Sequence, residues 1–498
     1  MQKKNKVLLA VFGVAAAAIV IGFSIGSSKN ETKVIPPTCT DNGYTIVTKG
    51  GKTQFENIVA ATGHSFTPWQ IGQEAQDGAA GVRSRSCSVC GYEERELFQQ
   101  EGQMPQIYLS GDIAGIGKKE QVALSVTFSI DGVEFNGYAS MKYQGHSSLQ
   151  YAKKNYTMKL YSDAECSDKQ KLTFSHWNPE NKYILKANFN DISRSRNLIC
   201  ADIWSQMVAT RENVQPRLLE TSNMGAVDGI PVLLYLNEEF QGIYNLTLHK
   251  DDALFAMKDG QKDGILIINE TQTPAAQFKA HIDWADSNDW EVEYCGTEDT
   301  SWLTEKLDRF MTFVQESSDE AFRQELREYA DVDSLIDYLL AIYALGLPEN
   351  SARDLILATY EDGVFFASLF DMEAGFGMKR DATGFYEPGY GLPQKTDGVW
   401  ASGTDSLLWD RLLQNFYPEI CSRYRALRKD VLSTDKILSQ AAEKLALIDP
   451  GFNQTEMTIY PTQPLQNVPP MAQINEYTTQ RLALLDEILM EENDDEQN

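Results

Sequence analysis

Apolar and polar residues alternate along much of the chain between residues 107 and 268, and this pattern predicts a mostly antiparallel β-sheet. The runs are VALSVTFSI (122–130), GYASMKYQG (137–145), NYTMKLY (155–161), YILKANF (183–189), PVLLYLN (231–237), GIYNLTL (242–248) and GILIIN (264–269). One helix is expected to interrupt these strands, around Arg196 to Val208, after a turn at Asn190-Asp191.

From Trp302 onward the apolar residues recur at helical spacing instead. Helices are predicted in WLTEKLDRFMTFV (302–314), SLIDYLLAIYAL (334–345), SLLWDRLLQNF (406–416), TDKILSQAAEKLALI (434–448) and INEYTTQRLALLDEILM (474–490). A single hairpin, LILATY-EDG-VFFASLF (355–370), breaks this helical half. A strand-rich half followed by a helix-rich half predicts an α+β fold with a cleft between two lobes.

The first 26 residues are typical of a secretory signal peptide or an N-terminal membrane anchor. Lys3, Lys4 and Lys6 precede an uncharged apolar run over residues 7–26, close to the roughly 20 residues that cross a bilayer. Because basic residues stay on the cytoplasmic side, we expect the rest of the chain to be membrane-anchored or secreted, on the extracytoplasmic face. We further expect a linker at 27–37, a small module at 38–100, a large domain at 104–450, a helical extension at 451–490 and an acidic tail at 491–498.

The formal net charge of -27 over 498 residues argues against nucleic acid or an anionic lipid surface as a partner. Seven cysteines are too few and too scattered for a disulfide scaffold. Cys166, Cys200, Cys295 and Cys421 are expected to be lone thiols that act as small buried hydrophobes.

The small module holds the remaining cysteines and a candidate metal site. Cys87-Ser88-Val89-Cys90-Gly91 has the spacing of a zinc knuckle, and Cys39 and His64 can complete a tetrahedral set. A disulfide, which is natural outside the cell, and three idle thiols are the alternatives.

Four carboxylates are expected to converge at the mouth of the predicted hairpin. If Asp362-Gly363 is a two-residue turn, Asp354 lies directly opposite Asp371, with Glu349 and Glu373 close by. Two like charges in that position call for a cation between them or a protonated carboxyl group. The same order of acidic residues serves phosphoryl transfer in protein kinases, where carboxylates hold magnesium. An acidic cluster facing solvent is the alternative interpretation.

A second element lies at residues 141–160, MKYQGHSSLQYAKKNYTMKL. Its small polar turn can cradle phosphates through backbone N–H groups and hydroxyls, and a following lysine can pair with them. An exposed strand face is the alternative for those lysines. The candidate nucleotide-binding residues here are Gln144, Gly145, Ser147, Ser148, Lys154 and Lys159.

Five segments in order give the chain a resemblance to the spore coat CotH kinase family, an atypical, extracytoplasmic protein-kinase-like group, over roughly residues 104–450. They are QGHSSLQYAKKNYTMKLY, YILKANFNDISRSRNLICADIW, GAVDGIPVLLYLNEEFQGIYNLTLHKD, ENSARDLILATYEDG and FDMEAGFG, followed by SLLWDRLLQNF. The resemblance implies a divergent protein-kinase-like fold with a sheet-rich N-lobe and a helical C-lobe. It also implies ATP, Mg²⁺ or Mn²⁺, and phosphorylation of Ser/Thr in surface or spore-coat proteins.

Roles for individual residues follow from the same resemblance. Glu349 would orient or deprotonate the acceptor hydroxyl, and Asp354, Asp371 and Glu373 would hold the metal. Gly145, Ser147, Ser148, Lys154 and Lys159 would lie near the nucleotide, and Arg196-Asn197 would brace the lobes or a phosphate.

The chain departs from the family pattern at three of these positions. The family more usually has Asp at Glu349, Lys-Asn at Arg353-Asp354, and Asp-x-Asp at Asp371-Met372-Glu373. A misplacement of about 1 Å can cost roughly 100-fold in rate. A catalytically impaired pseudokinase that acts as a surface-binding or structural protein is therefore the alternative function.

Overall fold

The computed structural model describes residues 31–39, 43–49, 52–59, 63–68, 70–73, 81–98, 104–174, 176–221, 223–268, 273–285 and 289–490. The chain divides into two compact units, one of residues 1–70 with 84–95 and one of residues 71–83 with 96–498. The predicted signal or anchor segment at 1–26 and the acidic tail at 491–498 lie outside the described residues. Within the described ranges, no helix combines the length and apolar character that a bilayer crossing requires.

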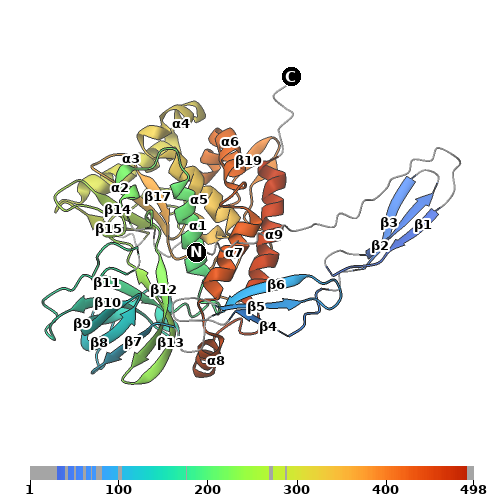
Figure 1. The fold of residues 1–498 in the computed structure, drawn as a ribbon. Coiled ribbons are helices and arrows are strands. Elements are labelled where there is room, and N and C mark those ends of the chain that lie inside the picture. The colour runs from blue at the N-terminus through green and yellow to red at the C-terminus, as the bar shows by residue number, and fades with distance from the viewer. Residues whose placement is uncertain are drawn as a thin grey trace, which may run out of the picture. The chain divides into compact units, whose positions relative to one another are not determined.

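The N-terminal part of the chain forms short strands (Figure 1). Glu31–Ile35 (β1), Gly43–Lys49 (β2) and Lys52–Val59 (β3) make one antiparallel sheet. Gln70–Gln73 (β4), Gly81–Ser86 (β5) and Glu93–Phe98 (β6) make another.

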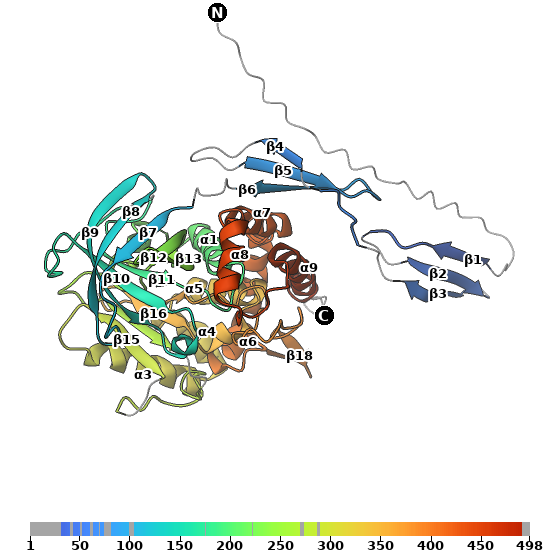
Figure 2. The ribbon, with the colours of Figure 1, turned by 90° about the horizontal axis from the view of Figure 1, so that it is seen from below.

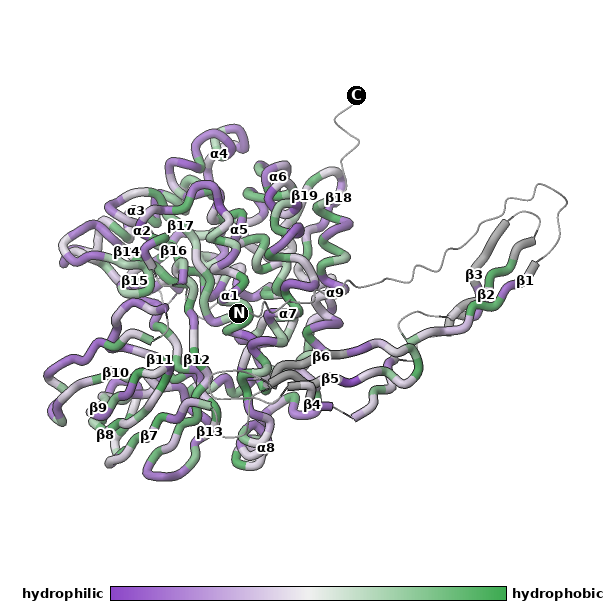
Figure 3. The backbone as a smooth tube through the Cα atoms, in the orientation of Figure 1, coloured by the Kyte–Doolittle hydropathy of each residue, from purple (hydrophilic) through white to green (hydrophobic). Residues whose placement is uncertain are grey.

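The alternating runs of the sequence form a closed barrel with the strand order β10-β11-β13-β12-β7-β8-β9. Neighbouring strands are antiparallel except for the β7–β12 pair, which is parallel. Because side chains alternate between the two faces of a strand, hydrophobic and hydrophilic residues alternate along the barrel (Figure 3). The strands are Gln106–Ser110 (β7), Val122–Ile130 (β8), Val133–Gln144 (β9), Asn155–Tyr161 (β10), Lys182–Lys186 (β11), Gly229–Leu236 (β12) and Glu239–Leu248 (β13).

A second sheet, with the order β15-β14-β16-β17, belongs to the helical half of the molecule. It joins Gly264–Ile268 (β14) and Trp290–Cys295 (β15) to the predicted hairpin, Leu355–Thr359 (β16) and Phe366–Leu369 (β17). The run GILIIN was expected in the first sheet with the other strands. That expectation is wrong, because β14 pairs with β16 and every residue of β14 is buried between layers. A small ribbon of Gln394–Thr396 (β18) and Val399–Ala401 (β19) lies further along the chain.

Helices cover this second sheet, and the barrel lies on its other side in Figures 1 and 2. The predicted helices appear as Arg196–Ala209 (α1), Ser301–Glu316 (α3), Val332–Ala344 (α5), Leu407–Leu427 (α6), Thr434–Leu445 (α7) and Pro470–Leu489 (α9). Pro216–Leu219 (α2) and Asp319–Glu325 (α4) were not predicted, whereas Pro450–Ile459 (α8) lies in the stretch expected to be a helical extension. The fold is therefore α+β, as the sequence indicated.

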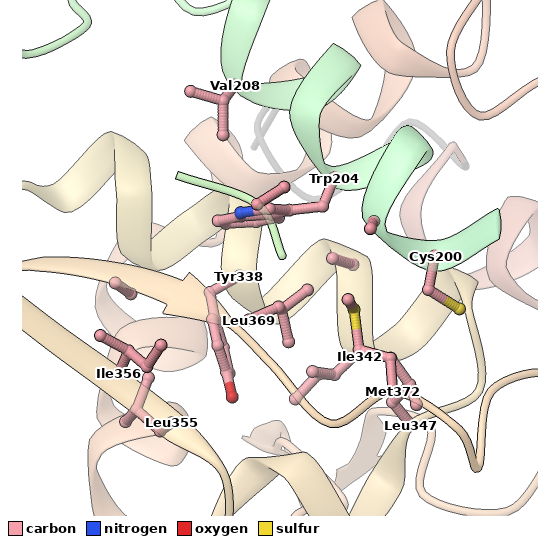
Figure 4. Close-up of a cluster of buried hydrophobic side chains, with 14 of the residues drawn as sticks. Cys200, Trp204, Val208, Tyr338, Ile342, Leu347, Leu355, Ile356, Leu369 and Met372 are labelled. Carbon is pink, nitrogen blue, oxygen red and sulfur yellow. The ribbon is translucent and has the colours of Figure 1, made fainter. Parts of the chain in front are cut away.

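Helix α1 packs against α5 and against the strands β16 and β17 of the second sheet. Its Trp204 contacts Tyr338 of α5 edge-on, with ring centroids 6.2 Å apart (Figure 4). Every residue of α5 except Asp333 is buried, which explains why its apolar residues surround the helix instead of forming one stripe. The core that α1 and α5 share with β16 and β17 fixes the ends of those two strands, where the acidic residues lie.

The C-terminal helices pack into the same unit through buried charges. Glu456 of α8 pairs with Lys153 and Arg194, at 2.8 Å from each, and all three side chains are inaccessible to solvent. Arg481 of α9 donates to the carbonyl oxygen of Tyr343 at the end of α5. Removing one member of such a buried set costs about 3–5 kcal/mol, so α8 and α9 are integral to this part of the chain.

Candidate functional site

A solvent-open cleft of about 1110 Å³ lies between the barrel and the second sheet. The barrel contributes the end of β9, the turn that follows it, and β10 and β11. The second sheet contributes β15 and the segments that flank β16 and β17. Among the lining residues are Gln144, Gly145, Ser147, Ser148, Lys186, Asp354, Phe370, Asp371, Glu373 and Arg380.

The turn after β9 needs a glycine. Gly145 has φ of +104°, and a Cβ placed there would lie 2.1 Å from Oγ of Ser148. Asn155 donates to that same Oγ at 3.3 Å, and its Oδ1 accepts the backbone N–H of Ala187 at 2.6 Å. The turn is thus tied to the end of β11, directly beside the lysine at position 186.

Lys186 is the cation at the centre of the cleft. Its Nζ donates to Oδ1 of Asp371 and lies 3.8 Å from Oε2 of Glu373. Burial disfavours the charged lysine, but the two carboxylates outweigh it and raise its pKa. For Asp371 burial is likewise opposed, by Lys186 and Arg380, so its pKa is lowered. Burial raises the pKa of Glu373.

Arg380 lies between the two aspartates. Its NH1 is 2.5 Å from Oδ2 of Asp354 and its NH2 is 3.5 Å from Oδ2 of Asp371. Burial raises the pKa of Asp354 to about 7, with a further rise from Asp371 and an opposing effect from Arg380. Two features reduce the repulsion between these aspartates, as expected for a close pair. A cation lies between the carboxylates, and the pKa of one carboxyl group is raised.

The predicted register of the hairpin is wrong by one residue. The turn lies at Glu361-Asp362, with φ of 52° and 59°, and Gly363 N–H donates to the Tyr360 carbonyl oxygen. Positive φ at both central residues is typical of a type I′ turn, which matches the twist of the strands. A two-residue turn alone would pair Leu355 with Ser368, but Leu355 pairs with Leu369, so one extra residue stands between the turn and β17. Asp354 therefore stands opposite Phe370 instead of Asp371.

Asp354, just before β16, and Asp371, just after β17, nevertheless converge, and each has a left-handed backbone conformation with φ of 54°. Residues other than glycine rarely adopt this conformation, and its cost is of order 1–3 kcal/mol each. Such strain clusters at ligand-binding sites, and here it turns both carboxylates toward Arg380.

Comparison with protein families bears on this arrangement. The profile of the family described as CotH kinase protein matches residues 141–485, which is more than half of the chain. The chain belongs to the CotH kinase family. A search of curated proteins found no match. The matched range includes the turn after β9, Lys186, the acidic residues and most of α9, and in the described part of the chain Lys118 is the one cleft-lining residue outside it.

Arg196 and Asn197 contact the loop that carries Asp371 and Glu373, which lines this CotH cleft. Arg196, predicted as a nucleotide-binding residue, is buried and donates to the Gly375 carbonyl oxygen at 2.8 Å and to Gln473 of α9 at 2.7 Å. Oδ1 of Asn197 accepts the backbone N–H of Met372 at 2.7 Å. Of the two expected roles, bracing fits these contacts, since the pair fixes the loop that carries Asp371 and Glu373.

Glu349 lines a neighbouring hollow of about 720 Å³ that shares Ser147, Tyr151 and Arg380 with the cleft. Its Oε1 accepts from the hydroxyl of Tyr386 at 2.9 Å. Its Oε2 lies 3.7 Å from NH1 of Arg353. Glu349, which was predicted to orient or deprotonate an acceptor hydroxyl, therefore lies in the hollow next to the cleft.

The two lysines predicted for the nucleotide are placed elsewhere. Nζ of Lys154 donates to the carbonyl oxygens of Leu149 and Tyr151, and so stabilises its own turn. Lys159 lies on β10 beside Lys182, and in the described part of the chain neither Lys154 nor Lys159 lines the cleft. Lys186, which sequence reasoning missed, is a lysine that does line the cleft. The signal was present, since Lys186 ends an apolar strand run of the kind that normally excludes a lysine.

The cysteines separate into two groups. Cys39, His64, Cys87 and Cys90 come together, with their ligand atoms all within 4.8 Å of one another. Cys200 and Cys421 are buried as expected, whereas Cys166 and Cys295 are only half-buried. All seven thiols are free.

Proposed function

We propose that this CotH kinase protein transfers the γ-phosphate of ATP to Ser or Thr hydroxyls of surface or spore-coat proteins. The observation that carries the proposal is the content of one cleft, which combines a glycine turn, a buried lysine and three carboxylates. Phosphoryl transfer needs little covalent chemistry from the protein, and it depends on positioning and charge stabilisation around the phosphates.

The donor set in the cleft fits a divalent metal. Asp354, Asp371 and Glu373 offer oxygen ligands of the kind that Mg²⁺ or Mn²⁺ prefers. Held by these carboxylates, the metal would supply positive charge that offsets the charge developing on the transferred phosphate. Lys186 would hold Asp371 and Glu373 in place and contact the phosphates, while the backbone and hydroxyls of the Gln144–Ser148 turn would cradle them.

Glu349 would serve the acceptor. Its contact with Tyr386 holds it in the hollow that shares Ser147, Tyr151 and Arg380 with the cleft. In this role it would orient the incoming hydroxyl or accept its proton. The barrel and the helical part would then act as the two lobes of a divergent kinase.

The direct test is transfer of label from γ-labelled ATP to a casein-like acceptor by the full chain, with Mg²⁺ or Mn²⁺. We expect Asp371→Asn to lower the rate at least about 100-fold, because a metal ligand is lost. Asp362→Asn, at the exposed tip of the same hairpin, is the matched control and should retain the rate. Absence of transfer with either metal, from protein that binds ATP, would contradict the enzymatic proposal.

One observation favours a second candidate, a nucleotide-binding pseudokinase. Arg380 already bridges Asp354 and Asp371, and Glu349 is held by Tyr386 and Arg353. In that case the chain would bind ATP in calorimetry, and its affinity would fall in Lys186→Met, while labelled phosphate would stay on the nucleotide. Surface docking would then be its role.

We also propose that the protein works outside the cytoplasm. The proposal rests on the three lysines that precede the apolar run at residues 7–26. Its acidic net charge of -27 fits protein acceptors better than nucleic acid. A reporter that is active only outside the membrane, fused after residue 498, should give signal, and one that is active only in the cytoplasm should not.

A further inference from the structure

The cluster formed by Cys39, His64, Cys87 and Cys90 has the dimensions of an occupied metal site. Sγ of Cys39 lies 3.8 Å from Sγ of Cys87, and Sγ of Cys90 lies 3.4 Å from Nδ1 of His64. A tetrahedral zinc ion, with bonds of about 2.3 Å to sulfur and 2.0–2.1 Å to nitrogen, places neighbouring ligand atoms about 3.8 Å (S···S) and 3.5 Å (S···N) apart. We propose that this module binds one zinc ion through three thiolates and one imidazole.

The backbone around Cys87 is built to hold a thiolate. The N–H of Ser65 donates to its Sγ at 3.4 Å, and the backbone N–H groups of Val89 and Cys90 also point to that sulfur. Gly91 N–H donates to the Cys87 carbonyl oxygen at 2.9 Å, and Gly91 has a positive φ of 73°. The segment between β5 and β6 is therefore a tight knuckle that presents two thiols to one point.

The other two ligands are also positioned from outside the cluster. The imidazole of His64 stacks on the ring of Tyr92, with centroids 4.7 Å apart and an interplanar angle of 17°. Gly63 N–H donates to the Cys39 carbonyl oxygen at 3.1 Å, which brings the first ligand beside the second. Outer contacts of this kind orient the ligands and are typical of metal sites.

The geometry does not match a disulfide. The 3.8 Å between the Cys39 and Cys87 sulfurs far exceeds the S–S bond length of about 2.05 Å, and a Cys39–Cys87 disulfide would leave Cys90 and His64 without a role. With four protein ligands the zinc would have no open position, so the site is structural. It would join three chain segments in a part of the molecule made of short strands, where a metal commonly replaces a large core.

The test uses the full chain, purified with its thiols reduced and analysed for metal content. We expect about one zinc per chain to survive dialysis, and none to survive in Cys87→Ser. Cys166→Ser, a half-buried cysteine outside the cluster, is the matched control and should keep its zinc. Retention of zinc by Cys87→Ser, or a wild type without zinc, would overturn the proposal.

Cobalt provides a measurement that does not depend on how the Cys87→Ser chain folds. Co²⁺ added to the zinc-free wild type should give the visible bands of a tetrahedral thiolate site, which added Zn²⁺ removes. In Cys90→His a ligand is kept, so the bands should persist while the sulfur-to-cobalt charge-transfer band falls by about one third, from three thiolates to two. Octahedral cobalt bands, or a Cys39–Cys87 disulfide in protein isolated without oxygen, would refute zinc binding.

Discussion

Two clusters of side chains of the kinds that bind metals stand out in the described part of the chain, and they differ in what lies between their donor atoms. At Cys39, His64, Cys87 and Cys90, soft donors converge at the spacing of a tetrahedral ion. In the cleft, hard carboxylate donors converge with Lys186 and Arg380 placed between them. The first cluster is preorganised for a metal, whereas the second is already balanced by the protein's own cations.

Because of this difference, we expect metal binding to change the stability of the two clusters by different amounts. A closed thiolate site gains folding free energy from zinc directly. A carboxylate cluster that is already paired gains little from a lone magnesium ion, which must compete with an arginine and a lysine. Nucleotide phosphates would change that balance, because they offer Lys186 and Arg380 a new partner and add oxygen ligands for the metal.

The largest expected effect comes from Lys186→Met, which removes the main cation of the cleft. Phosphate transfer should fall at least about 100-fold, and the free energy of unfolding should fall by about 1–3 kcal/mol, because Asp371 and Glu373 lose the lysine that pairs with both of them. Labelled ATP and urea unfolding measure the two effects. Lys182→Met, on the same strand but paired with Asp251, is the control and should leave transfer intact.

A chelator should separate the two clusters. Strong chelation of zinc should expose residues 31–95 to proteolysis, since a structural metal present at 1,000 times its Kd contributes about 4 kcal/mol. Residues 104–490 should keep their resistance, because their core does not depend on that ion. Fragment masses over time measure the order of cutting. Simultaneous loss of both regions would remove the contrast between them.

Arg380→Met should make the carboxylate cluster respond to metal more as the Cys/His cluster does, because it removes a cation from between the donor atoms. Without the guanidinium, Asp354 and Asp371 repel each other, so the metal-free protein should lose about 1–3 kcal/mol of stability. Mg²⁺ alone should then raise Tm more than it does in wild type. Lys279→Met, which removes an exposed pair with Asp405, controls for general loss of charge. An unchanged response to Mg²⁺ would show that Arg380 does not hold the metal position.

The pH dependence of the metal-free protein should report Asp354. Its folded pKa, about 7, lies above the ordinary value of 3.8, so the folded state binds more protons than the unfolded state between those values. Stability should therefore fall as pH rises from about 4 to 7, by at most about 4 kcal/mol. Asp354→Asn should flatten this slope and raise stability at pH 7. Urea titrations across that range measure it, and an equally steep slope in the variant would reject this origin.

The smallest expected effect is that of Gly145→Ala in the turn after β9. Positive φ and the contact with Ser148 should cost about 1–2 kcal/mol and distort the turn. ATP affinity should weaken by a factor of about 5–10, while zinc content stays unchanged. Gly132→Ala, at another positive-φ turn with open space around it, controls for backbone strain alone. Equal ATP affinity in wild type and Gly145→Ala would show that the turn does not contact the nucleotide.

Sequence patterns predicted most strands and the long helices because one face of each is buried. Apolar residues therefore recur about every 2 residues in a strand and every 3.6 in a helix. They missed α2 and α4, which are short, and they assigned β14 to the first sheet. The partner of a buried strand is set by tertiary packing, since the apolar run of β14 fits either sheet.

In the candidate site, the carboxylates could be predicted and their cations could not. Asp-Gly is a strong turn signal, yet the turn formed one residue earlier, at Glu361-Asp362, with one extra residue before β17, so the pairing differs by one from the predicted register. Arg380 comes from a loop without periodicity, so nothing in its neighbours indicated that it would reach Asp354. Cysteine and histidine spacing was more informative, because a knuckle is local in sequence.

We propose that the cleft binds a divalent metal only when a nucleotide is also bound. The most direct measurement is the Tm of the zinc-loaded full chain with millimolar Mg²⁺ alone, ATP alone, and both together. We predict a small shift with either alone and a shift with both that exceeds their sum, lost in Lys186→Met. A rise with Mg²⁺ alone as large as that with Mg²⁺ and ATP, or no rise with any combination, would contradict the account.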